Sequence, residues 1–255
     1  MPSKTFPAAG PITVQARFGT GTLRVTATED CPEIQVRVAA GDPAARALAD
    51  QLVVTRRGHT LLLASPRPKV IVDLGLVTGL GGNGPGALAM TVLVPAGSSV
   101  QAASVRADVE TTGRLANVIL AGSQARVELD TVEGALRVRA GAGGLRAGRV
   151  GGNVSVRLGR GDVWLDEVGG DVDLVTGSGQ LDVGLRAGQV ARFDVHAGHG
   201  KLHTEMPAGS QRPAGTGTPI TIRAKTGHGD VFLRRAPVPS DPVPSDPVPP
   251  DPVLS

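Results

Sequence analysis

The sequence predicts an all-β chain, a single-domain β-solenoid (β-helix-like) made of eighteen-residue coils. A small residue, any residue and then Val or Leu recur every nine residues in ten successive units, from Ala107-Asp108-Val109 to Gly188-Gln189-Val190. Another apolar residue usually follows two positions later, which is the period of a strand with one buried face. Each nine-residue unit is therefore expected to be one short strand followed by one glycine-rich turn.

A further alternation doubles this period and gives the coil two unlike corners. Five residues after each Val or Leu, valine and glycine alternate, as Val132, Val150 and Val168 against Gly141, Gly159 and Gly177. We therefore expect two strands on opposite walls of each coil. Such coils bury their apolar faces only against neighbouring coils, so many are needed for stability.

Composition fits a narrow core of aliphatic side chains. Hydrophobic residues make up 40% of the 255 residues, but aromatic residues only 2%, and there is no tyrosine. A compact globular core normally includes large rings as space fillers. The 36 glycines and 20 prolines indicate many turns and a loose tail.

Shorter elements precede the regular repeats, which we place at residues 98–206 of a domain spanning 10–236. Residues 1–9 are expected to be flexible. Asp42 and Pro43 are suited to the N-cap and first position of one short N-terminal helix in GDPAARALADQL. The strand-like segments of residues 10–97 are FGTGTLRV (18–25), EIQVRV (33–38), the hairpin-like VVTRRGHTLLLAS (53–65) and TVLVPAG (91–97). We expect the 10–60 segment to cap one end of the solenoid.

The segments beside the most regular repeats have separate expected roles. The apolar VIVDLGLVTGL (70–80) is expected to cover one end of the solenoid or to dock a partner, and we favour the covering role. VARFDVHAGHGKLHTEM (190–206) is expected to continue the solenoid, and residues 219–235 to supply two closing strands after a Pro/Gly-rich loop. Residues 237–255 repeat Pro-Val-Pro-Ser-Asp-like units, which predict a disordered, polyproline-like tail. This tail is either a linker or a ligand for an aromatic-lined groove on another protein.

Together, FGTGTLRV, TVLVPAGSSV, the run of G-[DN]-V-x-[VL] strands and the final ITIRAKTGHGDVFLRR resemble a known family. It is the bacterial β-strand-repeat family called putative adhesins, domain-of-unknown-function family 4097. The resemblance covers roughly residues 10–235. It implies a β-solenoid-like fold and a binding role, and it brings no catalytic motif.

The residues give little support to a metal or catalytic site. A calcium β-roll places Asp two residues before the buried apolar residue, whereas Asp182 lies between the apolar Leu181 and Val183. His199 and His228 occupy matching turns and could approach each other on neighbouring coils, as weak candidates for a transition-metal site. Neither a phosphate loop nor a nucleophile is indicated, and the single Cys31 allows no intrachain disulfide. We therefore expect no cofactor and no catalytic residue.

Charges fall into two blocks. Residues 134–160 contain arginine and no acid, and residues 161–185 contain acids and no base. Stacked in a solenoid, they form a basic belt beside an acidic belt, with Arg149 next to Glu167. The belts are expected either to pair between coils or to direct self-association. The candidate residues are Arg137, Arg146 and Arg149 in the basic belt and Asp171, Asp173 and Asp182 in the acidic belt.

Two aromatic residues complete the candidate binding surface. Strand alternation turns Trp164 outward beside the acidic belt, and Phe232 outward at the matching position of DVFL. We interpret the chain as a non-enzymatic scaffold or interaction protein that binds a protein partner or itself. The alternative is a metal-dependent or carbohydrate-binding or carbohydrate-processing β-helical protein. The net charge of +3 does not favour nucleic acid, and without a signal-like or membrane-spanning segment we expect a cytoplasmic protein.

Overall fold

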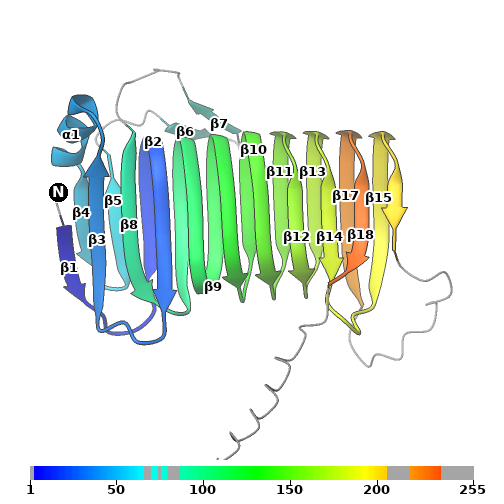
Figure 1. Cartoon of the computed structure of the whole chain (residues 1–255), viewed down its shortest axis with the longest axis horizontal. Helices are drawn as coiled ribbons and strands as arrows, with labels where there is room; N and C mark the ends of the chain where they lie inside the picture. The colour runs from blue at the N-terminus through cyan, green and yellow to red at the C-terminus, as the bar shows by residue number, and fades with distance from the viewer. Residues whose placement is uncertain (1–2, 66–69, 74–75, 80–86, 206–218, 237–255) are drawn as a thin grey trace, which may run out of the picture.

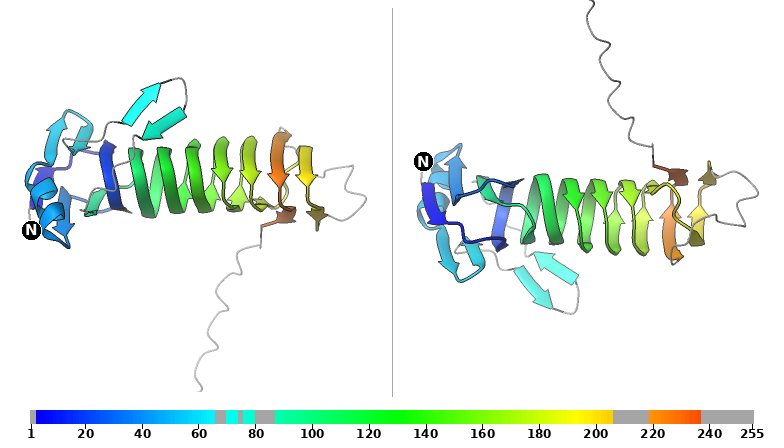
Figure 2. Two further views of the ribbon diagram at one scale, coloured as in Figure 1. Left: turned by 90° about the horizontal axis from the view of Figure 1, so that it is seen from above. Right: turned by 90° about the horizontal axis from the view of Figure 1, so that it is seen from below.

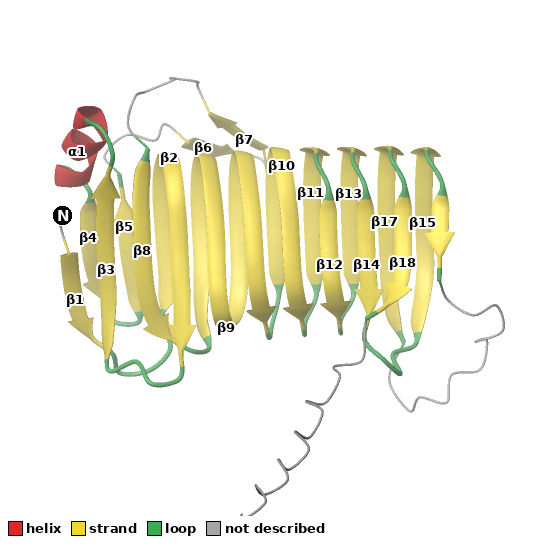
Figure 3. Cartoon of the chain, in the orientation of Figure 1, coloured by secondary structure: helices red, strands yellow, loops and turns green. Residues whose placement is uncertain are grey.

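The computed structural model describes residues 3–65, 70–73, 76–79, 87–205 and 219–236, which are mostly β (Figures 1 and 3). The prediction of a mostly β chain with one short helix is confirmed. The helix is α1 (Pro43–Asp50), and the strands are β1 (Ser3–Pro7), β2 (Thr13–Thr28), β3 (Glu33–Ala40), β4 (Val53–Arg57), β5 (Thr60–Ala64), β6 (Val70–Asp73), β7 (Leu76–Gly79), β8 (Leu88–Pro95), β9 (Ser98–Val132), β10 (Leu136–Val150), β11 (Val154–Arg160), β12 (Val163–Val168), β13 (Val172–Ser178), β14 (Leu181–Leu185), β15 (Ala191–His199), β16 (Leu202–Thr204), β17 (Ile220–His228) and β18 (Val231–Arg235).

Two rows of strands face each other across one continuous apolar core (Figure 2). They belong to one mixed sheet, because the long strands β2, β9 and β10 bend and enter both rows. The first row runs β4-β5-β2-β9-β10-β11-β13-β17-β15. The second runs β1-β3-β8-β2-β9-β10-β12-β14-β18-β16. We call a segment of the first row, with its continuation in the second, a coil.

Neighbouring coils of the repeat region are parallel and offset by eighteen residues. Leu136 pairs with Val118 on one side and with Val154 on the other, and Leu145 pairs with Val163. All five side chains are buried. A slip of one residue would turn this whole apolar set towards water, which is why the pairing is well specified.

The two corners differ as the sequence predicts. Val132, Val150 and Val168 are buried and stack at one corner. At the other corner Gly161 has φ of +141°, and a Cβ there would collide with the carbonyl oxygen of Gly143 one coil earlier. Only glycine meets both requirements. The result is a Gly-x-Gly column through five coils, at 141–143, 159–161, 177–179, 227–229 and 198–200.

Antiparallel strands and the helix close the N-terminal end. Asp42 is the N-cap of α1, and its side chain accepts a hydrogen bond from the Ala45 amide at 2.7 Å, as expected. Strands β4 and β5 form the predicted hairpin. The expectation of a flexible N-terminus over residues 1–9 is wrong for residues 3–7, because they form β1 and pair with the edge of β3.

At the C-terminal end the coils do not follow chain order. Strands β17 and β18 lie inside the stack, and β15 and β16 form its outermost coil (Figure 1). The expectation that residues 219–235 close the stack is therefore wrong. The tenth nine-residue unit is also wrong as a strand, because Gly188 and Gln189 belong to a turn in which the Gln189 amide donates to the Arg186 carbonyl at 3.1 Å.

That turn lengthens the connection and lets the chain pass over one coil position. An eighteen-residue step would place Val190 beside Val172. Ile222 takes this place instead, and Phe193 pairs with Ile222 one coil farther out. The remaining expected segments, the loop over 207–218 and the tail over 237–255, lie outside the described residues.

Strands β6 and β7 pair only with each other in the described structure. They contact β9 and project from the side of the stack (Figure 2). Strands β6 and β7 therefore do not cover an end of the stack, where we expected segment 70–80 to lie.

Candidate interaction surfaces

One outward column on the second row contains both candidate aromatic residues and two of the six charged candidates, Arg146 and Asp182. Glu128 pairs with Arg146, and Arg146 with Trp164. Beyond Trp164 the column continues through Asp182 and Phe232 to His203. The predicted matching positions of Trp164 and Phe232 are therefore confirmed by the register.

The two aromatic residues have different surroundings. Trp164 is half-buried and lines a hollow of about 470 Å³ with Arg126, Glu128, Arg146 and Asp162. Phe232 is also half-buried, but the His203 ring stacks on it with centroids 4.5 Å apart and planes 10° from parallel. Trp164 is therefore the aromatic side chain with open space beside it.

Most of the acidic belt is bound to arginine from coils on both sides. Arg149 lies 3.2 Å from Glu167, which is the pair expected from the sequence, and Arg186 reaches the same carboxylate from the other side at 2.6 Å. The hydrogen bond from Arg186 is the main reason that the pKa of Glu167 lies below its usual value. Weaker pairs join Arg146 to Asp166 at 3.9 Å and Arg157 to Asp173 at 3.7 Å.

Asp182, a candidate residue of the acidic belt, is also paired with an arginine. The Asp182 side chain is only 18% exposed, and Arg234 lies 2.8 Å from it. The same arginine also lies 3.0 Å from Asp166. The physical reason is that the inserted coil of β17 and β18 brings Arg234 alongside the acidic belt. These contacts fit the expected pairing of the charge belts between coils.

The acids in the turns bind backbone amides of the next coil. Asp162 Oδ1 accepts from the Gln180 amide at 2.7 Å, and Asp171 Oδ1 accepts from the Thr221 amide at 2.7 Å. Asn117 and Asn153 do the same for Ala135 and Asp171. Aspartate and asparagine can both take this role because each provides an acceptor oxygen. In the described residues, no group of three or more His, Cys, Asp or Glu side chains is placed to hold a metal ion.

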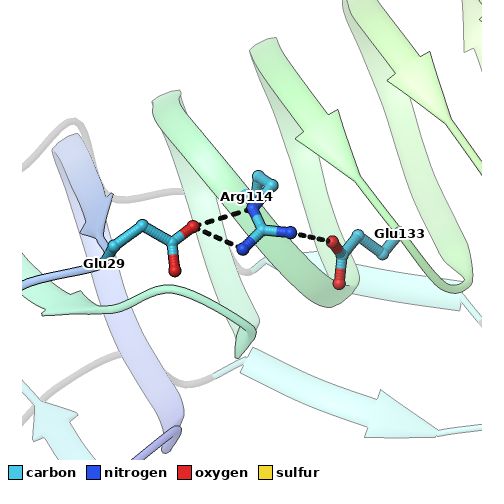
Figure 4. A network of polar contacts seen from close by, with 3 residues as sticks. All are labelled: Glu29, Arg114 and Glu133. Atoms are coloured by element: carbon cyan, nitrogen blue, oxygen red, sulfur yellow. Dashed lines mark hydrogen bonds and ion pairs between the residues drawn. The ribbon is translucent and has the colours of Figure 1, made fainter.

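A similar charge bridge links coils near the start of the repeats. Arg114 donates to Glu29 through Nε at 2.9 Å and through a second nitrogen, and to Glu133 at 2.9 Å (Figure 4). The hydrogen bond with Glu29 is the main cause that raises the pKa of Arg114. Because solvent screens exposed pairs of this kind, they contribute little to stability.

The first row carries the other candidate residues. Arg137 is exposed and lies between Ile119 and Ser155 in an outward column that continues to Asp173. A second hollow of about 340 Å³ is lined by residues that include Asp171, Asp173 and Arg223. Arg137 lies two coils away from Asp173, so the structure does not bring the charged candidates into one site.

The histidine pair forms as expected. The His199 and His228 rings stack with centroids 4.7 Å apart and planes 7° from parallel. They occupy the middle position of Gly-x-Gly turns on the two outermost coils. With no third ligand group in the described residues, this pair is a ring contact between coils.

The outermost coil exposes residues that would be core residues elsewhere in the stack. Phe193 pairs with buried Ile222 and is 43% exposed, and Leu202 pairs with buried Val231 and is 52% exposed. The outer edge of β15 pairs with no strand of the described structure. Sequence reasoning missed this surface because it placed residues 219–235 over it.

No family model matches the chain, and no curated protein matches it. The comparison with solved structures found a "putative cell adhesion protein" from Clostridium sporogenes, with 12% identity and a TM-score of 0.44 over 92% of this chain and 99% of that one. It also found a "putative adhesin" from Bacteroides fragilis, with 10% identity and a TM-score of 0.40 over 91% of this chain and 95% of that one. A "putative adhesin" from Parabacteroides distasonis has 13% identity and a TM-score of 0.38 over 91% of this chain and 96% of that one. At these values the membership of the adhesin family stays a prediction. Among the described residues, α1 is too short to cross a membrane.

Proposed function

We propose that the chain is a β-solenoid and a non-enzymatic interaction protein, and that its open C-terminal end joins a second copy of the chain. The observation that carries this proposal is the exposure of Phe193 and Leu202 in columns that are otherwise buried. The acids of the described coils support a non-enzymatic role, since they bind arginines and backbone amides. Localisation in the cytoplasm remains an expectation.

A second copy suits this end because both copies offer the same apolar columns and the same unpaired edge. An antiparallel contact centred on Phe193 places Arg192 of each copy opposite Asp194 of the other. Opposite charges directly across an antiparallel pair stabilise it. Asp194 already lies 3.7 Å from Arg223, so the contact would extend an existing ion pair.

The other end of the stack favours a closed dimer over a filament. Its edge strand β1 is short and largely exposed, and it contains Lys4 and Pro7. Lysine and proline on an edge strand oppose further pairing, and proline has no amide hydrogen to donate. An end that pairs only with its own kind gives a two-fold dimer, whereas head-to-tail contact gives open assemblies.

Sedimentation velocity across a range of protein concentrations tests the proposal. The chain is expected to show a monomer–dimer equilibrium, and Phe193→Asp or Leu202→Asp to leave the monomer. Val53→Asp is the matched control, since Val53 is 47% exposed on β4 near the opposite end. The dimer is expected to persist in that variant. A wild-type chain that is monomeric at every concentration, or a dimer lost only with Val53→Asp, contradicts the proposal.

A further inference from the structure

A missing side chain creates the hollow beside Trp164. One outward column lies directly after the Gly-x-Gly corner. In this column Arg126 lies one coil before Gly144, and Asp162 lies one coil after it. Both neighbours carry long or polar side chains, whereas Gly144 carries none. The hollow of about 470 Å³ therefore has a floor of glycine backbone and walls of side chains from three coils.

The walls combine an aromatic ring with balanced charges. Trp164 pairs in register with Arg146 and lines the hollow with it. Arg126 and Glu128 line the hollow as a loose ion pair at 3.8 Å, and both side chains are more than half exposed. Two arginines and two carboxylates, those of Glu128 and Asp162, cancel in charge. This lining offers hydrogen-bond donors and acceptors around a ring and attracts neither an anion nor a cation.

We propose that this hollow binds a neutral saccharide. A pyranose ring has an aliphatic C–H face that packs on an indole, and the bare backbone at Gly144 allows a flat ring to come close. Its hydroxyls both donate and accept, so they can bond to guanidinium donors of Arg126 and Arg146 and to carboxylate acceptors of Glu128 and Asp162. The hollow falls within the range of about 300–1,000 Å³ for small-ligand sites.

Other ligand classes fit less well. A metal ion or an organic cation would meet two arginines, and an anionic group would meet two carboxylates. A purely apolar ligand would bury charged walls without hydrogen bonds, which is costly. Asp162 Oδ1 is already bound by the Gln180 amide, so the site offers binding groups and not a free pair of catalytic acids.

The sequence supplies its own reporter for the test, because Trp164 is the only tryptophan and tyrosine is absent. Intrinsic emission therefore reports on one wall of the hollow. The probes are soluble hexasaccharides of glucose, galactose, mannose and N-acetylglucosamine, titrated into the full-length chain and into its Phe193→Asp variant. At least one probe is expected to change the emission saturably with a dissociation constant of about 1 mM or tighter, equally in both proteins. Binding by Phe193→Asp separates this proposal from the proposed dimer.

Gly144→Arg fills the hollow while leaving Trp164 in place. Gly144 does not have a left-handed φ, and a Cβ there would meet only the Asp162 carbonyl oxygen at 3.6 Å, so the fold accommodates it. Gln180→Arg is the matched control, since it adds the same side chain to the same column, one coil beyond Asp162 and outside the hollow. We expect at least a tenfold loss of affinity with Gly144→Arg and less than a twofold change with Gln180→Arg.

Calorimetric titration of Trp164→Ala, which needs no fluorescence, is expected to show the same loss as Gly144→Arg. An unchanged thermal melting curve shows that these variants remain folded. The proposal is overturned if no saccharide changes the Trp164 emission, or if Gly144→Arg and Gln180→Arg bind equally well.

Discussion

The coil of β17 and β18 and the coil of β15 and β16 share a Gly-His-Gly turn and lie side by side. Both contain Gly-His-Gly at the tight corner, and the two histidine rings stack. Yet the first coil is enclosed between neighbours, and the second, which comes earlier in the chain, is the open end. Their difference shows that the position of a coil in the stack does not follow from chain order alone.

The enclosed coil has the better core residues. It contributes Ile220, Ile222, Val231 and Leu233, all buried, whereas the outer coil offers Phe193 and Thr204 at the positions of Ile222 and Leu233. An enclosed coil buries apolar surface on both sides, so aliphatic residues gain most there, at about 25 cal/mol per Å².

The largest expected difference in the free energy of unfolding is between Ile222→Ala and Phe193→Ala. Ile222 and Phe193 pair directly on neighbouring coils. Ile222→Ala is expected to lower the free energy of unfolding by about 2–4 kcal/mol, because it leaves a cavity in an enclosed column. Phe193→Ala is expected to cost less than about 1 kcal/mol, because its ring is already partly in water. Denaturant unfolding, measured at a concentration where the chain is monomeric, gives both values. Equal costs would contradict the assignment of inner and outer coils.

The next largest effect on stability is expected from removing the buried hydroxyl of Thr226 in the inner coil. Thr226 Oγ1 lies 3.2 Å from the Gly179 carbonyl oxygen and 3.1 Å from that of His228, so it ties two coils at the tight corner. Thr226→Val is expected to cost about 1 kcal/mol.

Thr111→Val is the matched control, because the buried Thr111 hydroxyl has no hydrogen-bond partner in the described structure. We expect it to be neutral or stabilising, since it removes an unpaired polar atom. Thermal and denaturant unfolding of both variants tests the pair. A larger loss with Thr111→Val would show that the corner hydroxyl does not hold the coils together.

The repeats predicted most of this architecture because the sequence of each coil defines which of its residues face inward and where its corners lie. Alternation places Val163 and Leu165 inward and Trp164 outward, and the valine and glycine corners follow from the same period. Coil order could not be predicted, because the nine-residue period by itself does not say which coil lies next to which. The chain leaves the regular order at the turn of Gly188 and Gln189. These two residues also fit the nine-residue pattern, so the pattern did not mark them as a turn.

The candidate site was predicted in part for the same reason. The outward column of Trp164 and Phe232 follows from alternation within single strands. That His203 covers Phe232, and that Arg234 binds Asp182, depends on which coil lies next to which. The exposure of Phe193 and Leu202 depends on coil order as well, so the open end was not accessible from the pattern.

Acid is expected to loosen the outer coil before the inner one. Asp230 Oδ1 accepts from the Lys201 amide at 2.8 Å, and this bond is the main cause that lowers the pKa of Asp230. A lowered pKa in the folded state means that the contribution of Asp230 is present above its unfolded value, about 3.9. It is lost as the pH falls through the folded value.

Amide exchange followed by NMR measures this loss at Lys201. Asp230→Ala is expected to reproduce it at neutral pH, with protection reduced over β15 and β16. Asp171→Ala is the control, because Asp171 makes the same bond to Thr221 on an inner coil held from both sides. We expect that variant to lose less protection, and equal losses would contradict the comparison.

The smallest expected effect is a gain of stability in the outer coil. Ala197 pairs with Thr226, so the outer coil has no hydroxyl at the position where Thr176 and Thr226 bind the corner carbonyls of their own and the preceding coil. Ala197→Thr would place Oγ1 towards the carbonyl oxygens of His199 and Gly229. One such hydrogen bond is worth about 0.5–1 kcal/mol. Because end coils open locally, we expect slower amide exchange over β15 and β16 with little change over β13. If protection stays the same or falls, the open end differs from the inner coils in its backbone geometry and not only in its side chains.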